Sequence, residues 1–176
     1  MKSSARAFIA DALTYAKKTA DDPSAASLHA RLACERFLRD YAEARKKSSR
    51  WSFDELAATR AMVFAEQMPN IKGPLAGQPI SLMDWQKFVY ANIFGFKERD
   101  TGTRRFRQGI VYVPKGNGKT TISAPLAMFL TFGENEGGAE ATRRRLRAIR
   151  LVFFLTPRKT WSGVATPCAT VGALAF

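Results

Sequence analysis

The chain has 176 residues, of which 46% are hydrophobic, and it carries a formal net charge of +13. This length fits one domain, or one domain with a helical arm, and the apolar fraction excludes wholesale disorder. The charge is uneven, because residues 141–176 hold six arginines, one lysine and no acid and so supply +7 of it. The balance favours a polyanionic partner: nucleic acid, a nucleotide or a membrane surface.

Cysteine and histidine usage argues against a zinc site. Cys34 and Cys168 lie far apart, His29 is the single histidine, and no metal-ligand spacing results. Two free thiols in a reducing cytosol are expected instead. Met1–Lys18 contains Asp11 and lacks a continuous apolar core, so we expect no signal peptide and a cytoplasmic protein.

The first third of the chain is predicted to be helical. Apolar residues at helical spacing predict a first helix over Ser3–Thr19 and a second over Ser24–Lys47. The segment Ser52–Glu55 is typical of a capping box and predicts a third helix that ends near Met68. Closely spaced prolines and glycines then predict a loop over Asn70–Pro79.

The next elements lead to a strand. A fourth helix is predicted over Ser81–Asn92, and a charged connector follows over Lys97–Arg107. The connector contains Arg104, Arg105 and Arg107. These arginines either touch phosphate or lie in an exposed charged turn, and the composition favours the exposed turn. Beyond them, a β-branched run predicts a buried strand over Gly109–Val113.

A glycine-rich turn follows this strand and leads into an apolar helix predicted over about Lys119–Phe132. Gly118 lets the backbone fold close to an anion, Lys119 is placed to reach outer phosphates, and the Thr120 hydroxyl is a candidate Mg²⁺ ligand. The helix would point its N-terminal amides at the phosphates. Val113 stands where the full P-loop pattern has its first glycine, so an ordinary strand-to-helix turn is the alternative.

Two segments in this order, Gly77–Phe96 with its Trp-Gln pair and the loop over Gly109–Thr121, resemble the large terminase subunit of tailed bacteriophages. This family is the motor ATPase and nuclease that packages viral DNA, and it tolerates the deviant first glycine. The resemblance covers about residues 28–140 and implies that ATP and Mg²⁺ are bound. It places Gln86 in an adenine-recognising motif and Thr120 on Mg²⁺. The nucleotide-binding residues are then Gln86, Lys115, Gly116, Asn117, Gly118, Lys119, Thr120 and Thr121.

The resemblance implies an α/β fold in which a helical arm precedes an incomplete P-loop NTPase parallel sheet of the RecA or terminase type. We predict the arm over residues 1–70, the start of the ATPase domain over 71–140 and a basic, aperiodic tail over 141–176. No acidic residue follows Glu140, so a Walker B aspartate and nuclease carboxylates are missing, and the chain alone is expected to be inactive.

The tail has two explanations. An abrupt change to arginine-rich, acid-free sequence indicates loss of the coding frame near Ala139–Thr142, whereas an authentic basic tail would bind DNA. Within the tail, Leu151–Leu155 is a candidate strand.

The terminase resemblance implies double-stranded viral DNA, the portal protein and the small terminase subunit as partners, in the cytoplasm of a bacterial host. The rival hypothesis is a small basic DNA-binding protein with an incidental P-loop. Nucleotide binding that is lost on Lys119→Ala would favour the terminase, and DNA affinity that falls steeply with salt would favour the rival. A small-molecule kinase is disfavoured by the Trp-Gln pair.

Overall fold

The computed structural model describes residues 2–22, 24, 26–71, 73–106, 108–113, 117–133, 141–142, 145–146, 150–154 and 172–174. Side chains are described within these ranges except at residues 2–6, 108, 112 and 120 and beyond residue 133. Four helices come first: α1 (Lys2–Asp21), α2 (Leu28–Ala44), α3 (Glu55–Glu66) and α4 (Asp84–Gly95). All four were predicted, and their ends differ from the predicted ends by a few residues.

The start of α3 corrects the predicted capping box. Asp54 is the N-cap residue, and its carboxylate accepts the backbone N–H of Ala57 at 2.9 Å. Ser52 lies instead in a short strand, β1 (Trp51–Phe53), which pairs antiparallel with β2 (Phe96–Glu98). A strand of three residues carries too little alternation to be recognised in a sequence, and its partner is more than 40 residues away along the chain.

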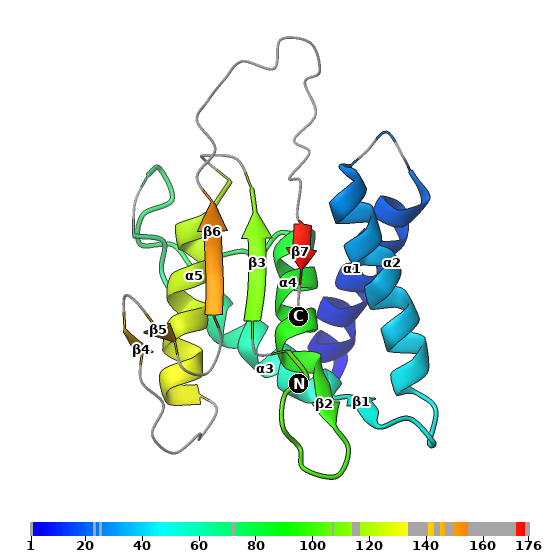
Figure 1. Cartoon of the computed structure of the whole chain (residues 1–176). Coiled ribbons are helices and arrows are strands. Elements are labelled where there is room, and N and C mark those ends of the chain that lie inside the picture. Colours follow the sequence, from blue (N-terminus) through cyan, green and yellow to red (C-terminus); the bar gives the residue numbers. More distant parts are fainter. Residues whose placement is uncertain are drawn as a thin grey trace.

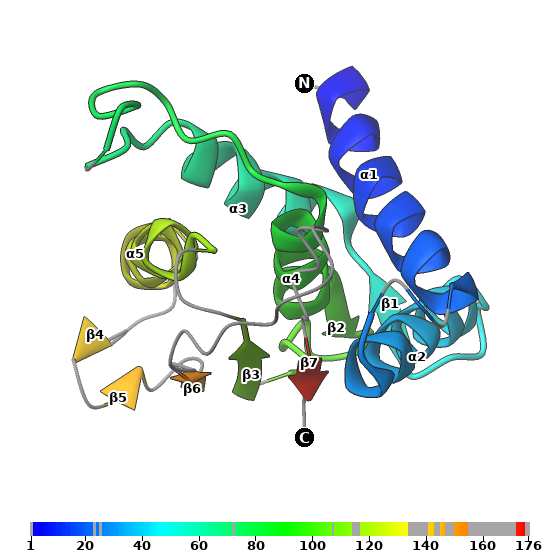
Figure 2. The same ribbon diagram turned by 90° about the horizontal axis from the view of Figure 1, so that it is seen from above.

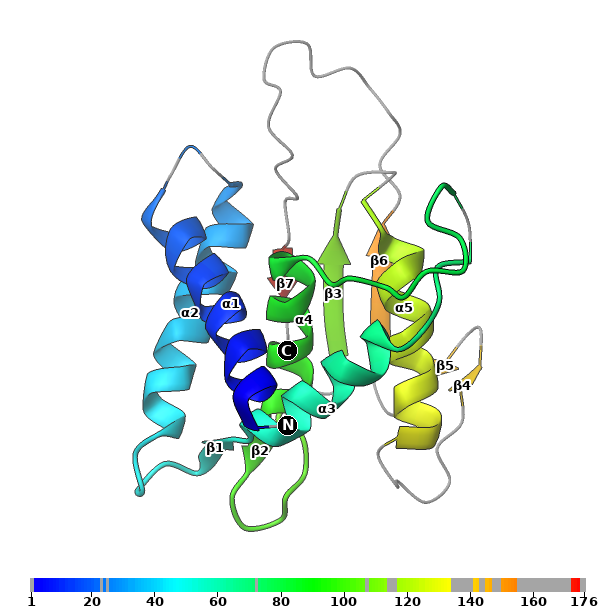
Figure 3. The ribbon, with the colours of Figure 1, turned by 180° about the vertical axis from the view of Figure 1, so that it is seen from behind.

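An aromatic core joins the helices to this small antiparallel sheet. Phe37 of α2 is fully buried, and its ring centroid lies 5.1–6.2 Å from those of four other rings. These rings belong to Tyr41, Phe53, Phe88 and Phe96. Figure 3 shows α1 crossing in front of this region, where its small residues Ala12 and Ala16 are fully buried. Small residues let helices approach closely, so the core is tightly packed.

A second sheet has three strands in the order β6–β3–β7. Its central strand β3 (Gln108–Tyr112) runs parallel to β6 (Arg150–Phe154) and antiparallel to β7 (Gly172–Leu174). The sheet is therefore mixed, and it is not the parallel sheet that the sequence predicted. A further antiparallel pair joins β4 (Ala141–Thr142) to β5 (Arg145–Leu146).

One face of the three-stranded sheet carries α4 and α5 (Lys119–Met128), as the view from above shows (Figure 2). Within the part of the chain that is described, no helix lies on the other face. The pair α1–α2 stands beside the sheet at its β7 edge (Figure 1). Helix α4 thus lies between the three-stranded sheet and the other helices, because it also packs against α1 and α3.

The helix after the turn is not a continuous α-helix to Phe132. It ends at Met128 and continues as one π-helical turn, η1 (Phe129–Gly133). Pro125 lies inside α5 and lacks the amide hydrogen that would bond the carbonyl oxygen four residues earlier, at Thr121. The buried side chains of Ile122, Leu126 and Leu130 still hold the element against its neighbours.

Candidate nucleotide-binding site

The turn between β3 and α5 ends in a left-handed glycine directly before the helix. Gly118 is the N-cap of α5 and has φ = 67° and ψ = 21°, in the left-handed region. Only glycine adopts this conformation without strain, so the Gly before Lys119 is required by the turn itself. The residue that replaces the first glycine of the pattern, Val113, is fully buried at the end of the strand. Pro114, Lys115 and Gly116 lie outside the described residues.

Gly118 also has a close neighbour that leaves no room for a side chain. A Cβ atom built on Gly118 would lie 3.0 Å from Nε2 of Gln86, which is tighter than ordinary contacts allow. On this side, the start of α5 is covered by the buried side chain of Gln86. Three or four amides of a helical first turn have no intrahelical acceptor, and the helix end carries roughly half a positive charge. The start of α5 is suited to an anion.

Lys119 folds back along the turn. Its ammonium Nζ donates a hydrogen bond to the carbonyl oxygen of Val113 at 2.8 Å, so the side chain spans the loop from the helix to the strand. An ammonium group has three N–H donors, and this bond uses one of them. The bond holds the positive charge of Lys119 at the end of β3, on the other side of the turn from Gly118 along the chain.

Gln86 approaches the turn from α4. It occupies the third position of that helix, its side chain is 2% exposed, and its Oε1 accepts the backbone N–H of Met83 at 3.0 Å. This bond is one half of a capping arrangement, which satisfies an amide at the helix start. The predicted helix start at Ser81 was three residues early, because Met83 is the N-cap.

A second tie between α4 and α5 was missed by the sequence analysis. Tyr90 is fully buried, and its hydroxyl donates a hydrogen bond to the carbonyl oxygen of Ile122 at 3.1 Å. Burial raises the pKa of the Tyr90 phenol, so the hydroxyl keeps its proton and remains a donor. The sequence did contain a signal, since Tyr90 follows Gln86 by four residues and must share its helix face.

The predicted site residues that the structure describes come together. Asn117, Gly118, Lys119 and Thr121 lie at the start of α5, and Gln86 lies against Gly118. The backbone of Thr120 lies in the first turn of α5, while its side chain lies outside the described ones. Their proposed roles with a nucleotide stay predictions at this point.

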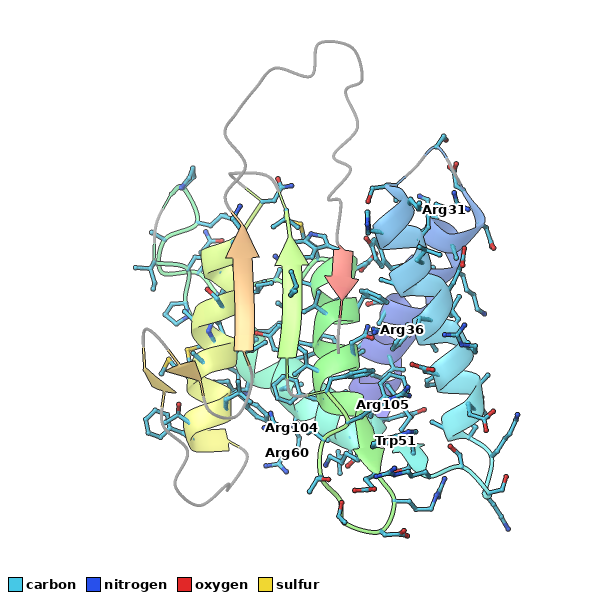
Figure 4. The ribbon with its side chains drawn as sticks, in the orientation of Figure 1. Arg31, Arg36, Trp51, Arg60, Arg104 and Arg105 are labelled. Carbon is cyan, nitrogen blue, oxygen red and sulfur yellow. The ribbon has the colours of Figure 1, made fainter. Side chains whose placement is uncertain are left out.

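Arg104 and Arg105 of the connector are half-buried and do not form an exposed turn. Arg105 is ion-paired with Asp40 at 3.2 Å, a quarter of its side chain is exposed, and its guanidinium lies over the rings of Trp51, Phe96 and Phe106. Figure 4 shows Arg105 and Trp51 together near the β1–β2 pair. Arg104 and Arg105 precede β3, whereas the turn follows it, and five strand residues separate the two ends by about 16 Å. Arg107 lies outside the described residues.

Two searches of the described residues for other kinds of site are negative. No group of three or more His, Cys, Asp or Glu side chains in that part of the chain is placed to hold a metal ion. None of the helices described here has the length and apolar character that crossing a bilayer requires.

Comparison with known proteins gives one family. The model of the family described as "Terminase large subunit, ATPase domain" matches residues 84–143, which run from the first residue of α4 through the turn and α5. No curated protein and no solved structure gives a significant match. The matched segment contains Gln86, Tyr90, Gly118 and Lys119, and the resemblance seen in the sequence is confirmed there. Residues 84–143 of the chain are therefore similar to the ATPase domain of the terminase large subunit.

Proposed function

We infer that this chain supplies the ATP-binding part of a viral DNA-packaging motor, with the triphosphate held at the turn between β3 and α5. One observation carries the proposal: a left-handed glycine at the start of α5 stands beside a lysine whose ammonium folds back over the loop. Both residues lie inside the segment that matches the terminase ATPase domain. An ordinary strand-to-helix turn would leave the lysine side chain in solvent, whereas Lys119 is hydrogen-bonded to the carbonyl oxygen of Val113.

The residues of the turn then divide the work of holding a triphosphate. The Lys119 ammonium neutralises charge on the outer phosphates, and the amides at Asn117 and Gly118 contribute N–H donors together with the helix end. Lys115 and Gly116 complete the loop by the terminase resemblance. Gly118 allows the left-handed backbone with which the turn enters the helix.

A magnesium ion fits the same proposal through Thr120. Its position directly after Lys119 places it in the first turn of α5, where a hydroxyl ligand of a phosphate-bound Mg²⁺ stands in P-loop proteins. When bound, Mg²⁺ would offset the negative charge of the phosphates. Asn117 and Thr121 flank this position along the backbone.

Binding without efficient hydrolysis is the proposed activity of this chain. A P-loop ATPase needs an acidic Walker B residue for the metal and a group that orients the attacking water. No Asp or Glu follows Glu140. Acidic residues before it form ion pairs with basic residues of the helical region, as in Asp54–Lys97 and Asp11–Lys87.

We propose that the chain divides near residues 70 and 140 into the helical arm, the start of the ATPase domain and the basic tail. We also propose that the reading frame is lost near residues 139–142.

The partners follow from the family rather than from a surface of this chain. We propose double-stranded viral DNA as the translocated substrate of the complete motor, with the portal protein and the small terminase subunit as protein partners. In that motor, ATP hydrolysis would drive DNA translocation, and a nuclease domain would cut the DNA.

Calorimetric titration of the full chain with Mg·ATP tests the proposal. We expect the Lys119→Ala variant to bind at least about tenfold more weakly, because a charged hydrogen-bond donor to phosphate is lost. Lys18→Ala removes the same charge from an exposed position on α1 and serves as the matched control, with unchanged affinity. Equal binding by the wild type and Lys119→Ala would contradict the proposal.

A further inference from the structure

Ile122 is the residue at which α5 is bonded both to its own first turn and to α4. Its backbone N–H donates to the carbonyl oxygen of Gly118 at 3.1 Å, and this bond closes the first turn of the helix. Its own carbonyl oxygen accepts the hydroxyl of Tyr90 at 3.1 Å, and its side chain is fully buried. The residue that joins the helix to the left-handed glycine is therefore held from α4.

Tyr90 presents its hydroxyl from a fixed position. The side chain is fully buried, and its ring centroid lies 5.9 Å from that of Phe94, one turn further along α4. Helix α4 in turn packs against α1 and α3. Close packing leaves a buried ring little freedom to move, and a tyrosine has only two side-chain torsions. The Tyr90 hydroxyl can therefore act as a fixed reference point for the first turn of α5.

Helix α5 is weakened directly after its first turn. Pro125 has no N–H, so the carbonyl oxygen of Thr121 lacks its usual helical donor, and the proline ring crowds that oxygen. The α-helical part has ten residues and continues as a π-helical turn. A short helix of this kind takes its position from tertiary contacts more than from its own hydrogen bonds.

The two ends of this element are held in different ways. At the far end, the ring centroid of Phe129 lies 5.4 Å from that of Phe64 and 5.2 Å from that of Phe94, so apolar packing holds the π-helical turn. At the near end, the Tyr90 hydroxyl bonds to a backbone atom of the first helical turns. A hydrogen bond fixes a distance and a direction, and it is therefore suited to placing the backbone accurately.

We propose that Tyr90 is a positioning residue for the nucleotide site: its hydroxyl fixes the first turn of α5, and through Ile122 it fixes the turn at Gly118. The inference rests on the proposed function, because it requires a phosphate group to bind at the start of α5. Tyr90 is fully buried, so it acts through the backbone of Ile122 and not by contact with the ligand. Its effect should be the same for every ligand that presents a triphosphate.

Calorimetric titration of the full chain and its Tyr90→Phe variant tests this role. The ligands are Mg·ATP, Mg·GTP and Mg·tripolyphosphate, and circular dichroism confirms that each protein is folded under the conditions of the titration. Tyr90→Phe keeps the ring and removes the hydroxyl. Loss of one buried hydrogen bond predicts an affinity about fivefold lower for each ligand that the wild type binds.

Two matched controls remove a hydroxyl elsewhere. Tyr41→Phe deletes a hydroxyl of α2 that donates to Oε1 of Glu55 at 3.2 Å. Thr131→Val deletes a hydroxyl at the far end of the α5 element, which donates to the carbonyl oxygen of Ala127 at 2.9 Å. Both variants should keep the wild-type affinities, even where they lower the free energy of unfolding. Without ligand, amide hydrogen exchange at Ile122 should be faster in Tyr90→Phe and unchanged in both controls.

The other outcomes contradict the inference. Lower unfolding stability of Tyr90→Phe with unchanged affinities would make Tyr90 a structural tie only. A loss confined to Mg·ATP would place its effect on the base, and an equal loss in Thr131→Val would show that any weakening of α5 suffices. A wild type that binds none of the three ligands overturns the proposed function and the inference together. Wild-type binding that Tyr90→Phe leaves unchanged overturns the inference alone.

Discussion

The two halves of the molecule are held together in different ways. The helical region over residues 2–106 has a core of stacked aromatic rings around Phe37 and ion pairs that join distant segments, such as Asp40–Arg105. The region of the turn, 108–133, rests on one five-residue strand and one helix that contains a proline. Described helices cover one face of its sheet. Parallel strands, such as the pair β3 and β6, are normally covered on both faces.

The residues that stabilise the fold and the residues of the proposed site thus lie in different regions of the molecule. Most of the buried side chains that the structure describes belong to the helical region, and α4 contacts the turn through Gln86 and α5 through Tyr90. The proposed nucleotide site therefore lies at the border of the helical region and not inside a complete sheet of its own. The following variants probe the two regions separately, beginning with the largest expected effect.

Phe37→Ala should damage the helical region most. The side chain is fully buried and contacts four other rings, and truncation of such a phenylalanine costs about 3–5 kcal/mol of unfolding free energy. Urea unfolding followed by circular dichroism measures the loss. Phe132→Ala, at a side chain that is 74% exposed, should change stability by less than about 0.5 kcal/mol. Similar losses in both variants would contradict the contrast between the regions.

Gly118→Ala should act on the turn. The left-handed backbone costs a Cβ-bearing residue about 1–2 kcal/mol, and the new Cβ would also press on Gln86. Gly102→Ala is the matched control, because it has φ = 68° and nothing within 4 Å of its Cβ position. Both variants should lose stability through backbone strain, while only Gly118→Ala should lose affinity for Mg·ATP. A loss of affinity in Gly102→Ala would argue against a local effect.

Alkaline pH should weaken the helical region through Cys34. Burial raises the pKa of its thiol from 9.0 to about 12, so the unfolded chain loses this proton at lower pH than the folded chain does. The contribution of the neutral thiol to the free energy of unfolding is fully present below pH 9. It decreases as the pH rises above 9, and at pH 10 about 1.4 kcal/mol of it is lost. Urea unfolding at pH 8 and pH 10 measures this, and Cys34→Ala should show a smaller difference. An equal pH dependence in the variant would contradict the assignment.

Tyr90→Phe should have the smallest effect, confined to the contact between α4 and α5. It removes one buried hydrogen bond, to the Ile122 carbonyl, and should cost about 1 kcal/mol. We expect faster amide exchange in α5 and unchanged exchange in α2. Faster exchange throughout the chain would show that the bond supports the whole molecule.

The sequence predicted what local patterns determine. Helices α1 to α4 follow from apolar spacing, and the strand and glycine turn before Lys119 follow from a short contiguous motif. Two features that depend on distant residues were missed: the pairing of Trp51 with Glu98 and the ion pair of Arg105 with Asp40. Asp54, and not Ser52, is the N-cap because Ser52 lies in β1. This strand is defined by its pairing with β2, which lies more than 40 residues later in the chain.

The central claim is that the turn at Gly118 and the start of α5 hold a nucleotide while the helical region stays passive. Hydrogen exchange of the full chain with and without Mg·ATP tests it most directly. We predict slower exchange with nucleotide over residues 109–122 and at the start of α4, and no change over residues 2–50. Unchanged exchange at the turn in the presence of saturating Mg·ATP, or protection centred on the helical region, would contradict the account.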